Sequence, residues 1–111
     1  LNTAPADVLI LPMTEDMGPA ISLATQLRDN RVRTQIYGEQ KKFKQKMNYA
    51  DKLGVPYVVF LGDDEIKQDK VSLKDMRSGE QELIPTAQAL DKIVAAMGAN
   101  DAEAPILDKG E

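Results

Sequence analysis

Short apolar runs and one alternating segment mark three strands in the first 61 residues of the chain. Residues 7–13 and 57–61 each contain a continuous apolar run, which is the pattern of a strand buried on both faces of a parallel sheet. Residues 32–37 instead alternate between two faces. That alternation predicts a strand at an edge of the sheet.

Two segments between these strands have apolar residues at helical spacing. Residues 19–29 begin with Pro19, which suits a first helical turn. Residues 39–53 are amphipathic, with lysines on the polar side, and stop at Gly54. Strands that alternate with helices imply right-handed crossovers and a mostly parallel sheet. The predicted core positions of the two helices are Ala20, Leu23, Ala24, Leu27, Phe43, Met47 and Ala50.

The pattern changes after the third strand. Residues 71–76 and 80–84 alternate at period two around a Ser-Gly turn, which predicts a hairpin. Thr86 is expected to cap a last helix that closes at Gly98. The predicted element order is βαβαβββα, an α/β domain over residues 6–98 with a five-stranded mixed sheet and three helices packed on it.

The composition limits the chemistry that the chain can perform. Its 111 residues allow one domain, and 42% hydrophobic against 29% charged residues are enough for a packed core. The chain has neither cysteine nor histidine. This excludes disulfide scaffolds, thiol nucleophiles, imidazole bases and metal sites built from these residues. A self-contained enzyme is therefore not expected.

The chain carries no sign of membrane insertion or secretion. No apolar run approaches the roughly 20 residues of a membrane span, and the start lacks the pattern of a signal peptide. We therefore expect a cytoplasmic protein. Because the chain begins at Leu1 instead of Met, we expect it to be part of a longer protein.

Charge is distributed unevenly along the chain. The net charge is −4, but residues 99–111 carry four acids and one lysine among Ala, Pro and Gly, so we expect a flexible acidic tail. The densest positive patch lies at the start of the second predicted helix, where the helix dipole favours anions. These lysines either bind nucleic-acid phosphates or form a solvated face. They are Lys41, Lys42, Lys44 and Lys46.

Three acidic residues, Asp63, Asp64 and Glu65, follow the third predicted strand, where open α/β sheets bind their ligands. No second acidic group with calcium-loop spacing follows, so no metal site is predicted. A solvated turn or a helix cap is the simplest interpretation. A carboxylate here is also suited to accept hydrogen bonds from the amino group of an unpaired RNA base.

Four further side chains are of interest for nucleic acid. Lys74 should point away from the apolar strand positions, either into solvent or towards a base. Arg77 lies beside the predicted turn, where its guanidinium is either solvated or stacked on a base. Tyr37 and Tyr49 offer rings for stacking, although a helical tyrosine is more often a partly buried anchor. No glycine-rich phosphate loop is present, so nucleotide hydrolysis is not expected.

Three segments together resemble the C-terminal anticodon-binding domain of class IIa aminoacyl-tRNA synthetases, and most closely that of histidyl-tRNA synthetases. The most diagnostic is the last, since related threonine and proline enzymes keep its Gly, Glu and basic positions but not the whole run. The resemblance covers about residues 6–98. The segments are FKQK with YADK at residues 43–52, LGDDE at residues 61–65, and VSLKDMRSGEQ at residues 71–81.

This resemblance implies that the chain reads tRNA. Glu65 matches a carboxylate that reads an anticodon base, and Lys74 matches a basic position beside it. Thr14 and Glu15, in the loop at residues 13–17, and the lysine segment match places where the family approaches the anticodon stem and loop. The implied partner is the anticodon stem-loop of histidine tRNA.

The resemblance also implies a larger parent protein. Family members are homodimers with an N-terminal catalytic domain that binds ATP, Mg and the amino acid. Its motifs are not found in this chain, so the chain is not expected to aminoacylate alone or to hold a cofactor. Two alternatives stay open: a synthetase-like paralogue used for regulation or protein contacts, and a receiver or flavodoxin-like signalling domain. Receivers need an acidic pair at the end of the first strand, where Pro12 and Met13 stand here.

Overall fold

The computed structural model describes residues 4–38 and 42–98. Within these residues it contains five strands and four α-helices, followed by a π-helical turn. Their order along the chain is β1 (Val8–Met13), α1 (Gly18–Asp29), β2 (Thr34–Ile36), α2 (Phe43–Leu53), β3 (Tyr57–Gly62), α3 (Asp63–Lys67), β4 (Lys70–Asp75), β5 (Gln81–Pro85), α4 (Thr86–Ile93) and the π-helix Val94–Gly98.

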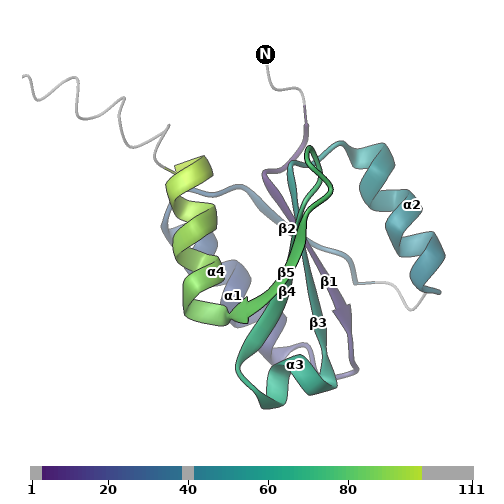
Figure 1. The fold of residues 1–111 in the computed structure, drawn as a ribbon, viewed down its shortest axis with the longest axis vertical. Coiled ribbons are helices and arrows are strands. Elements are labelled where there is room, and N and C mark those ends of the chain that lie inside the picture. The colour runs from purple at the N-terminus through teal and green to yellow at the C-terminus, as the bar shows by residue number, and fades with distance from the viewer. Residues whose placement is uncertain (1–3, 39–41, 99–111) are drawn as a thin grey trace, which may run out of the picture.

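The strands form one mixed sheet in the order β2-β1-β3-β4-β5 (Figure 1). β1 pairs in parallel with β2 and with β3, while the pairs β3–β4 and β4–β5 are antiparallel. The turn of the β4–β5 hairpin contains Gly79, whose φ of 82° is a left-handed conformation that favours glycine. The predicted α/β class, the five-stranded mixed sheet and the edge position of the second strand are confirmed.

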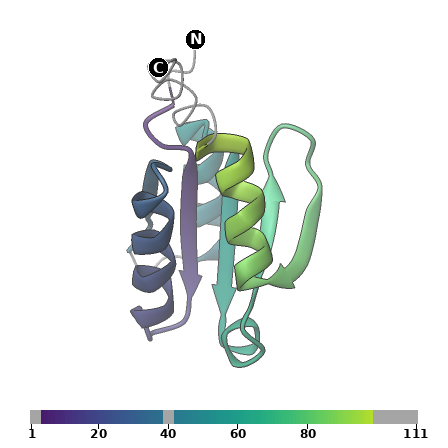
Figure 2. The same ribbon diagram turned by 90° about the vertical axis from the view of Figure 1, so that its left-hand side faces the viewer.

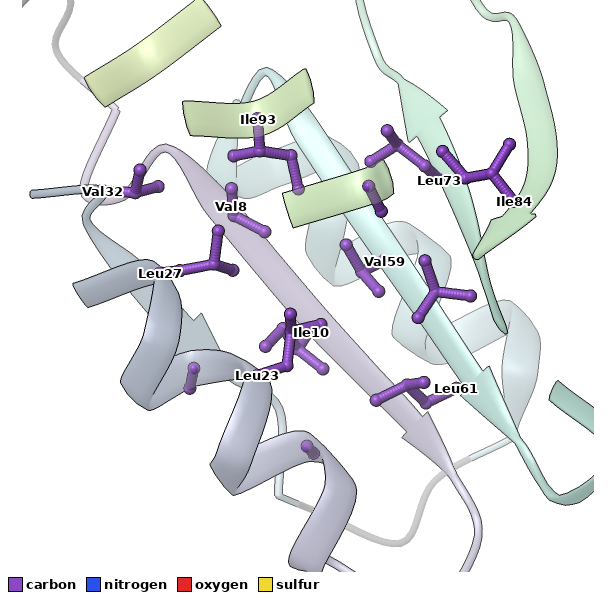
Figure 3. Packing of buried hydrophobic residues seen from close by; sticks show 14 residues of the cluster. Val8, Ile10, Leu23, Leu27, Val32, Val59, Leu61, Leu73, Ile84 and Ile93 are labelled. Atoms are coloured by element: carbon purple, nitrogen blue, oxygen red, sulfur yellow. The ribbon is translucent and has the colours of Figure 1, made fainter. Parts of the chain in front are cut away.

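The helices are divided between the two faces of the sheet. α1 and α4 cover one face, and α2 covers the other (Figures 1 and 2). Beneath α1 and α4 lies the larger core, in which Val8, Ile10 and Ile93 are fully buried (Figure 3). The buried positions of α1 are the four that its spacing predicts: Ala20, Leu23, Ala24 and Leu27.

The hairpin packs on α4 through one face only. Leu73 and Ile84 are buried on that face. On the same face Lys92 of α4 donates a hydrogen bond to Glu82 of β5, and this bond raises the pKa of Lys92. The hairpin is therefore held against α4, and among residues 4–38 and 42–98 no helix covers its opposite face.

The core beneath α2 is smaller and lies over β1 and β3. Leu9, Leu11, Val58 and Phe60 form it together with Ala50 of α2. In Figure 2, α2 lies behind β1 and β3, and the hairpin stands to one side of it. On the α2 side of the sheet, β4 and β5 are therefore less buried than β1 and β3.

The predicted element order lacks α3, and this is a correction. The three acidic residues after β3 form the first turn of this helix, where the helix dipole stabilises carboxylates. A helix of five residues is too short for its apolar spacing to be recognised in the sequence. Apart from α3, the strands and helices occur in the predicted order along the chain.

Two helix starts also differ from the prediction. Thr86 is the first residue of α4 and Pro85 is its N-cap, so Thr86 does not cap the helix. The backbone N–H of Thr86 instead donates to the carbonyl oxygen of Asp69 at 3.0 Å. α2 begins at Phe43, while residues 39–41 of the predicted helix, like the predicted acidic tail at 99–111, lie outside the described residues.

The hairpin turn is stabilised by the carboxylate of Asp75. Its Oδ1 accepts the backbone N–H of Arg77 at 2.9 Å and that of Ser78 at 3.3 Å, and it lies 3.6 Å from Nε of Arg77. The backbone hydrogen bond from Arg77 is the main cause that lowers the pKa of Asp75 below its ordinary value. Since the carboxylate form is favoured in the folded state, this group stabilises the fold at neutral pH.

Asp75→Asn is expected to lower the free energy of unfolding at pH 7 by about 1 kcal/mol, because hydrogen bonds to a charged acceptor are stronger than those to an amide. The deficit should begin to shrink as the pH falls below about 4, because the carboxyl of Asp75 takes up a proton in the unfolded chain first, and it should disappear once folded Asp75, whose pKa is lower, is protonated as well. Urea unfolding across this pH range tests the prediction. The control is Asp91→Asn on the exposed side of α4, and a deficit that does not change with pH would contradict the account.

Candidate nucleic-acid interface

The candidate site is centred on the side of the β4–β5 hairpin that faces away from α4. The register of β4 and β5 places Ser72 opposite Leu83 and Lys74 opposite Gln81, all on the α2 side of the sheet. Ser72 and Lys74 are half-buried, and Gln81 and Leu83 are exposed. Nε2 of Gln81 donates to Oγ of Ser72 at 2.8 Å. We call these four side chains the open face.

Glu65 stands at one end of the open face. Its Oε1 accepts the backbone N–H of Gly62 at 2.9 Å and so caps α3. A Cβ at position 62 would lie 2.5 Å from this oxygen, so glycine is needed to leave room for the carboxylate. Gly62 and Phe60 are two residues apart on β3 and share one face, which is the α2 side. The carboxylate of Glu65 therefore lies on the same side as the open face.

Lys74 lies on the open face but not beside Glu65. The register pairs Lys74 with Val58, whereas Glu65 is bonded to Gly62, four residues further along β3. At about 3.3 Å per strand residue, the two places on β3 are about 13 Å apart. Glu65 and Lys74 were expected to lie side by side. They lie instead near opposite ends of one strip of surface that follows β3 on the α2 side of the sheet.

The start of α2 presents exposed lysines. Lys42 is the N-cap and Lys44 lies in the first turn, where the helix dipole favours anions. Gln45 fixes this helix start, since its Oε1 accepts the backbone N–H of Lys42 at 3.2 Å and its own N–H donates to the Lys42 carbonyl at 2.9 Å. Lys41, the remaining lysine before the helix, lies outside the described residues.

Lys46 differs from these lysines because it is buried. Its side chain is 5% exposed, and Nζ donates to the carbonyl oxygen of Pro12 at 2.8 Å and lies 3.7 Å from Sδ of Met13. The expectation that Lys46 lies on the polar side of the helix is wrong, because it shares the sheet-facing side of α2 with Ala50. Lys46 ties α2 to the end of β1.

The loop after β1 lies next to Lys46. Thr14, Glu15 and Asp16 line an open hollow of about 570 Å³ together with Lys46 and Asp63. The backbone N–H of Asp16 donates to Oγ1 of Thr14 at 3.3 Å. The structure thus brings Thr14 and Glu15 to the end of the sheet where Glu65 also lies.

Arg77 lies at the other end of β3. Its guanidinium carbon is 5.7 Å from the centre of the Tyr57 ring, and its Nε pairs with Asp75. Tyr57 is the first residue of β3 and Gly62 is the last. Arg77 therefore does not join Glu65 in one site.

Tyr37 and Tyr49 pack on each other, with ring centres 4.9 Å apart. The hydroxyl of Tyr49 accepts a hydrogen bond from Nε2 of Gln35 on β2 at 3.0 Å. These rings fill the contact between α2 and β2, so neither is presented on the open face.

Sequence reasoning missed two exposed apolar residues around the open face. Phe43 is predicted to be in the core, but its side chain is 52% exposed. It is the first residue of α2 and lies at the border of the covered area, with its ring centre 5.8 Å from that of Phe60. Leu83 is 51% exposed. The sequence does not predict that Leu83 is exposed, because the number of strands that α2 covers depends on how the helix packs on the sheet.

A family model described as an anticodon binding domain matches residues 7–96. The chain belongs to the anticodon-binding domain family. The match covers nearly all of the described fold, including α3, the hairpin and the open face. It gives no support to the receiver or flavodoxin-like interpretation.

Curated relatives and solved structures agree with this family. The histidine–tRNA ligase of Clostridium tetani is 39% identical over 85 residues, which are 77% of this chain and 19% of that protein. The histidine–tRNA ligase of Thermococcus kodakarensis is 38% identical over 95 residues, 83% of this chain and 22% of that protein. The chain spans about a fifth of the length of the curated relatives it matches.

Among solved structures, the histidyl-tRNA synthetase of Nostoc sp. PCC 7120 superposes with a TM-score of 0.74 and 31% identity, covering 80% of this chain and 22% of that one. The RNA-binding domain of threonyl-tRNA synthetase from Cryptosporidium parvum Iowa II has a TM-score of 0.75 at 22% identity, covering 85% of this chain and 24% of that one. The second likeness shows the shared fold alone.

The residues that the structure describes, 4–38 and 42–98, show neither a metal-binding cluster nor a membrane-spanning helix. No group of three or more Asp or Glu side chains in this part of the chain is arranged to hold a metal ion. None of its helices has the length and apolar character needed to cross a membrane.

Proposed function

We propose that this anticodon-binding domain is the tRNA-reading module of a histidyl-tRNA synthetase, which attaches histidine to its tRNA during translation in the cytoplasm. The observation that carries the proposal is the open face, which has Glu65 at one end and Lys74 at the other in a chain of this family. The relatives named histidine–tRNA ligases support the choice of amino acid.

The proposed mechanism divides the work between two kinds of contact. Lys42 and Lys44, exposed at the start of α2, neutralise phosphates together with backbone N–H groups of the first helical turn. Glu65 and Lys74 contact the edges of unpaired anticodon bases laid along the strip between them. Phosphate contacts give affinity for any RNA, and base contacts give the preference for the histidine anticodon, GUG.

The remaining candidate residues have secondary roles in the proposed RNA binding. Thr14 and Glu15 approach the RNA from the end of the sheet near Glu65. Lys46 supports the end of β1, and a phosphate contact by its ammonium stays a prediction, as it does for Lys41. Arg77 meets the stem or loop outside the open face.

The parent protein in this proposal is a homodimer whose catalytic domain binds ATP, Mg and histidine. The anticodon-binding domain takes no part in the chemistry. Its contribution to transfer is to hold the tRNA so that the acceptor end reaches the catalytic domain in a productive orientation.

The proposal is tested by comparing three RNAs of equal length and charge. They are the histidine anticodon stem-loop, the same stem-loop with a replaced anticodon, and a continuous duplex. We expect the chain to bind the first most tightly in fluorescence anisotropy at moderate salt. Equal affinity for all three would contradict a reading function.

Lys44→Ala is expected to weaken binding to all stem-loops by a similar factor, because a phosphate contact carries no sequence information. The slope of log affinity against log salt should fall by about 1. Titrations at several salt concentrations measure this slope. Lys52→Ala, at the far end of the same helix and also exposed, should leave the slope unchanged, and an equal effect of both substitutions would contradict the contact.

A further inference from the structure

The ring of Phe43 is an aromatic surface exposed at the border of the open face. Its side chain is 52% exposed, although burial of an aromatic ring stabilises a fold. The ring of Phe60, itself 7% exposed, lies behind it with centres 5.8 Å apart. Phe43 is therefore supported on one side and open to solvent on another.

The orientation of α2 brings this ring towards β4. Tyr49 contacts Gln35, so that flank of the helix faces β2. Phe43 and Met47, one helical turn apart, lie on the other flank, and the contact of Phe43 with Phe60 shows that this flank faces β3. β4 is the next strand beyond β3.

Phe60 and Leu83 lie on the same side of the sheet, with one strand between them. The register puts Phe60, Ser72 and Leu83 in one row across three strands. At about 4.8 Å between neighbouring strands, Phe60 and Leu83 are about 10 Å apart at the backbone. Ser72 between them is small, and Leu83 is 51% exposed. The row thus ends in an exposed apolar side chain at Leu83 and, at Phe60, in a buried ring on which the exposed ring of Phe43 packs, with the small polar Ser72 between them.

The charges around this row favour RNA as its occupant. Lys42 and Lys44 flank Phe43 in the chain and are exposed, and Lys74 lies one row away on the open face. Aromatic rings combined with basic side chains form stacking sites for unpaired bases, whereas the cores of protein interfaces are poor in charge.

We propose that Phe43, held by Phe60, is the stacking platform for one unpaired base of the anticodon loop, and that Leu83 contacts the same base from the other side. This inference rests on the proposed function of the open face. It adds a contact that gives affinity for an unpaired base of any identity, since every base has a stacking surface.

The test is binding of stem-loops that carry 2-aminopurine at single loop positions, because stacking on an aromatic ring quenches its fluorescence. We expect wild type to quench one position strongly. Phe43→Leu keeps an apolar contact with Phe60 but should remove that quenching and weaken binding about 10-fold, and Phe43→Trp should restore both. Ile21→Leu, at a residue of α1 that is 54% exposed on the other face of the sheet, is the control.

The outcomes separate the two proposals. If wild type prefers the histidine anticodon but Phe43→Leu leaves affinity and quenching unchanged, the platform is overturned while the reading function stands. If wild type has no preference for the histidine anticodon but Phe43→Leu still removes the quenching, the reading function fails while the stacking contact stands; absence of quenching in wild type overturns the platform. Thermal unfolding of each variant checks that all are folded.

Discussion

Glu65→Gln should remove most of the preference for the matching anticodon base while leaving affinity for other RNAs nearly unchanged. Glutamine keeps an oxygen that accepts the Gly62 N–H, which Glu65 does at 2.9 Å, so α3 remains capped. Its other terminal atom is an NH2 nitrogen, which donates and cannot accept a hydrogen bond from a base amino group as the second carboxylate oxygen does. A good base contact gives about 1–3 kcal/mol of discrimination, so the ratio of the two dissociation constants should fall about 5- to 150-fold.

Two further variants sharpen this test. Asp64→Asn removes a carboxylate from the same first turn of α3, where it is exposed, and should leave the ratio unchanged. Gly62→Ala keeps Glu65 but displaces its carboxylate, because the new Cβ would lie 2.5 Å from Oε1, so it should reduce the ratio as Glu65→Gln does. Equal losses in Asp64→Asn and Glu65→Gln would show that only the net charge of the helix start matters.

Lys46→Met should lower the free energy of unfolding by about 1–3 kcal/mol. Methionine retains the length of the buried side chain but removes the ammonium that donates to the Pro12 carbonyl at 2.8 Å. A buried acceptor left without its partner carries a desolvation penalty of that size. Chemical denaturation followed by circular dichroism measures the change.

The matched control is Lys44→Met in the same helix, where the side chain is exposed and the change in stability should stay within about 0.5 kcal/mol. The same control should reduce the salt dependence of RNA binding as Lys44→Ala does. Unchanged stability in Lys46→Met would mean that the ammonium is not a structural group and is available to the RNA.

The sheet was predictable because its strands are marked by strong local patterns. The runs at β1 and β3 are buried on both faces, and the hairpin alternates with a clear turn. A helix cap was one interpretation of the acidic segment after β3, and Glu65 does cap α3, but the sequence did not identify which carboxylate would do so, nor the contact at the start of α4. These contacts depend on the Glu65 side chain returning to Gly62 and on the carbonyl of Asp69, which is distant in sequence from Thr86.

The candidate site was predictable as a list of residues but not as an arrangement. Glu65, Lys74 and Lys44 were named as candidates from residue type and resemblance, and the structure places Glu65 and Lys74 on one side of the sheet. The burial of Lys46 and the exposure of Phe43 were both missed. Each depends on how α2 is rotated and how far it reaches across the sheet, which periodicity alone does not fix.

The central claim is that the open face receives the anticodon loop, and amide shifts locate that contact most directly. An isotope-labelled sample is titrated with the histidine anticodon stem-loop and followed by two-dimensional NMR. The account predicts the largest shifts along Ser72, Lys74, Gln81 and Leu83, at Glu65 and at the start of α2, with small shifts on α1 and α4. Shifts concentrated on α1 and α4 would place the RNA on the other face of the sheet and contradict it.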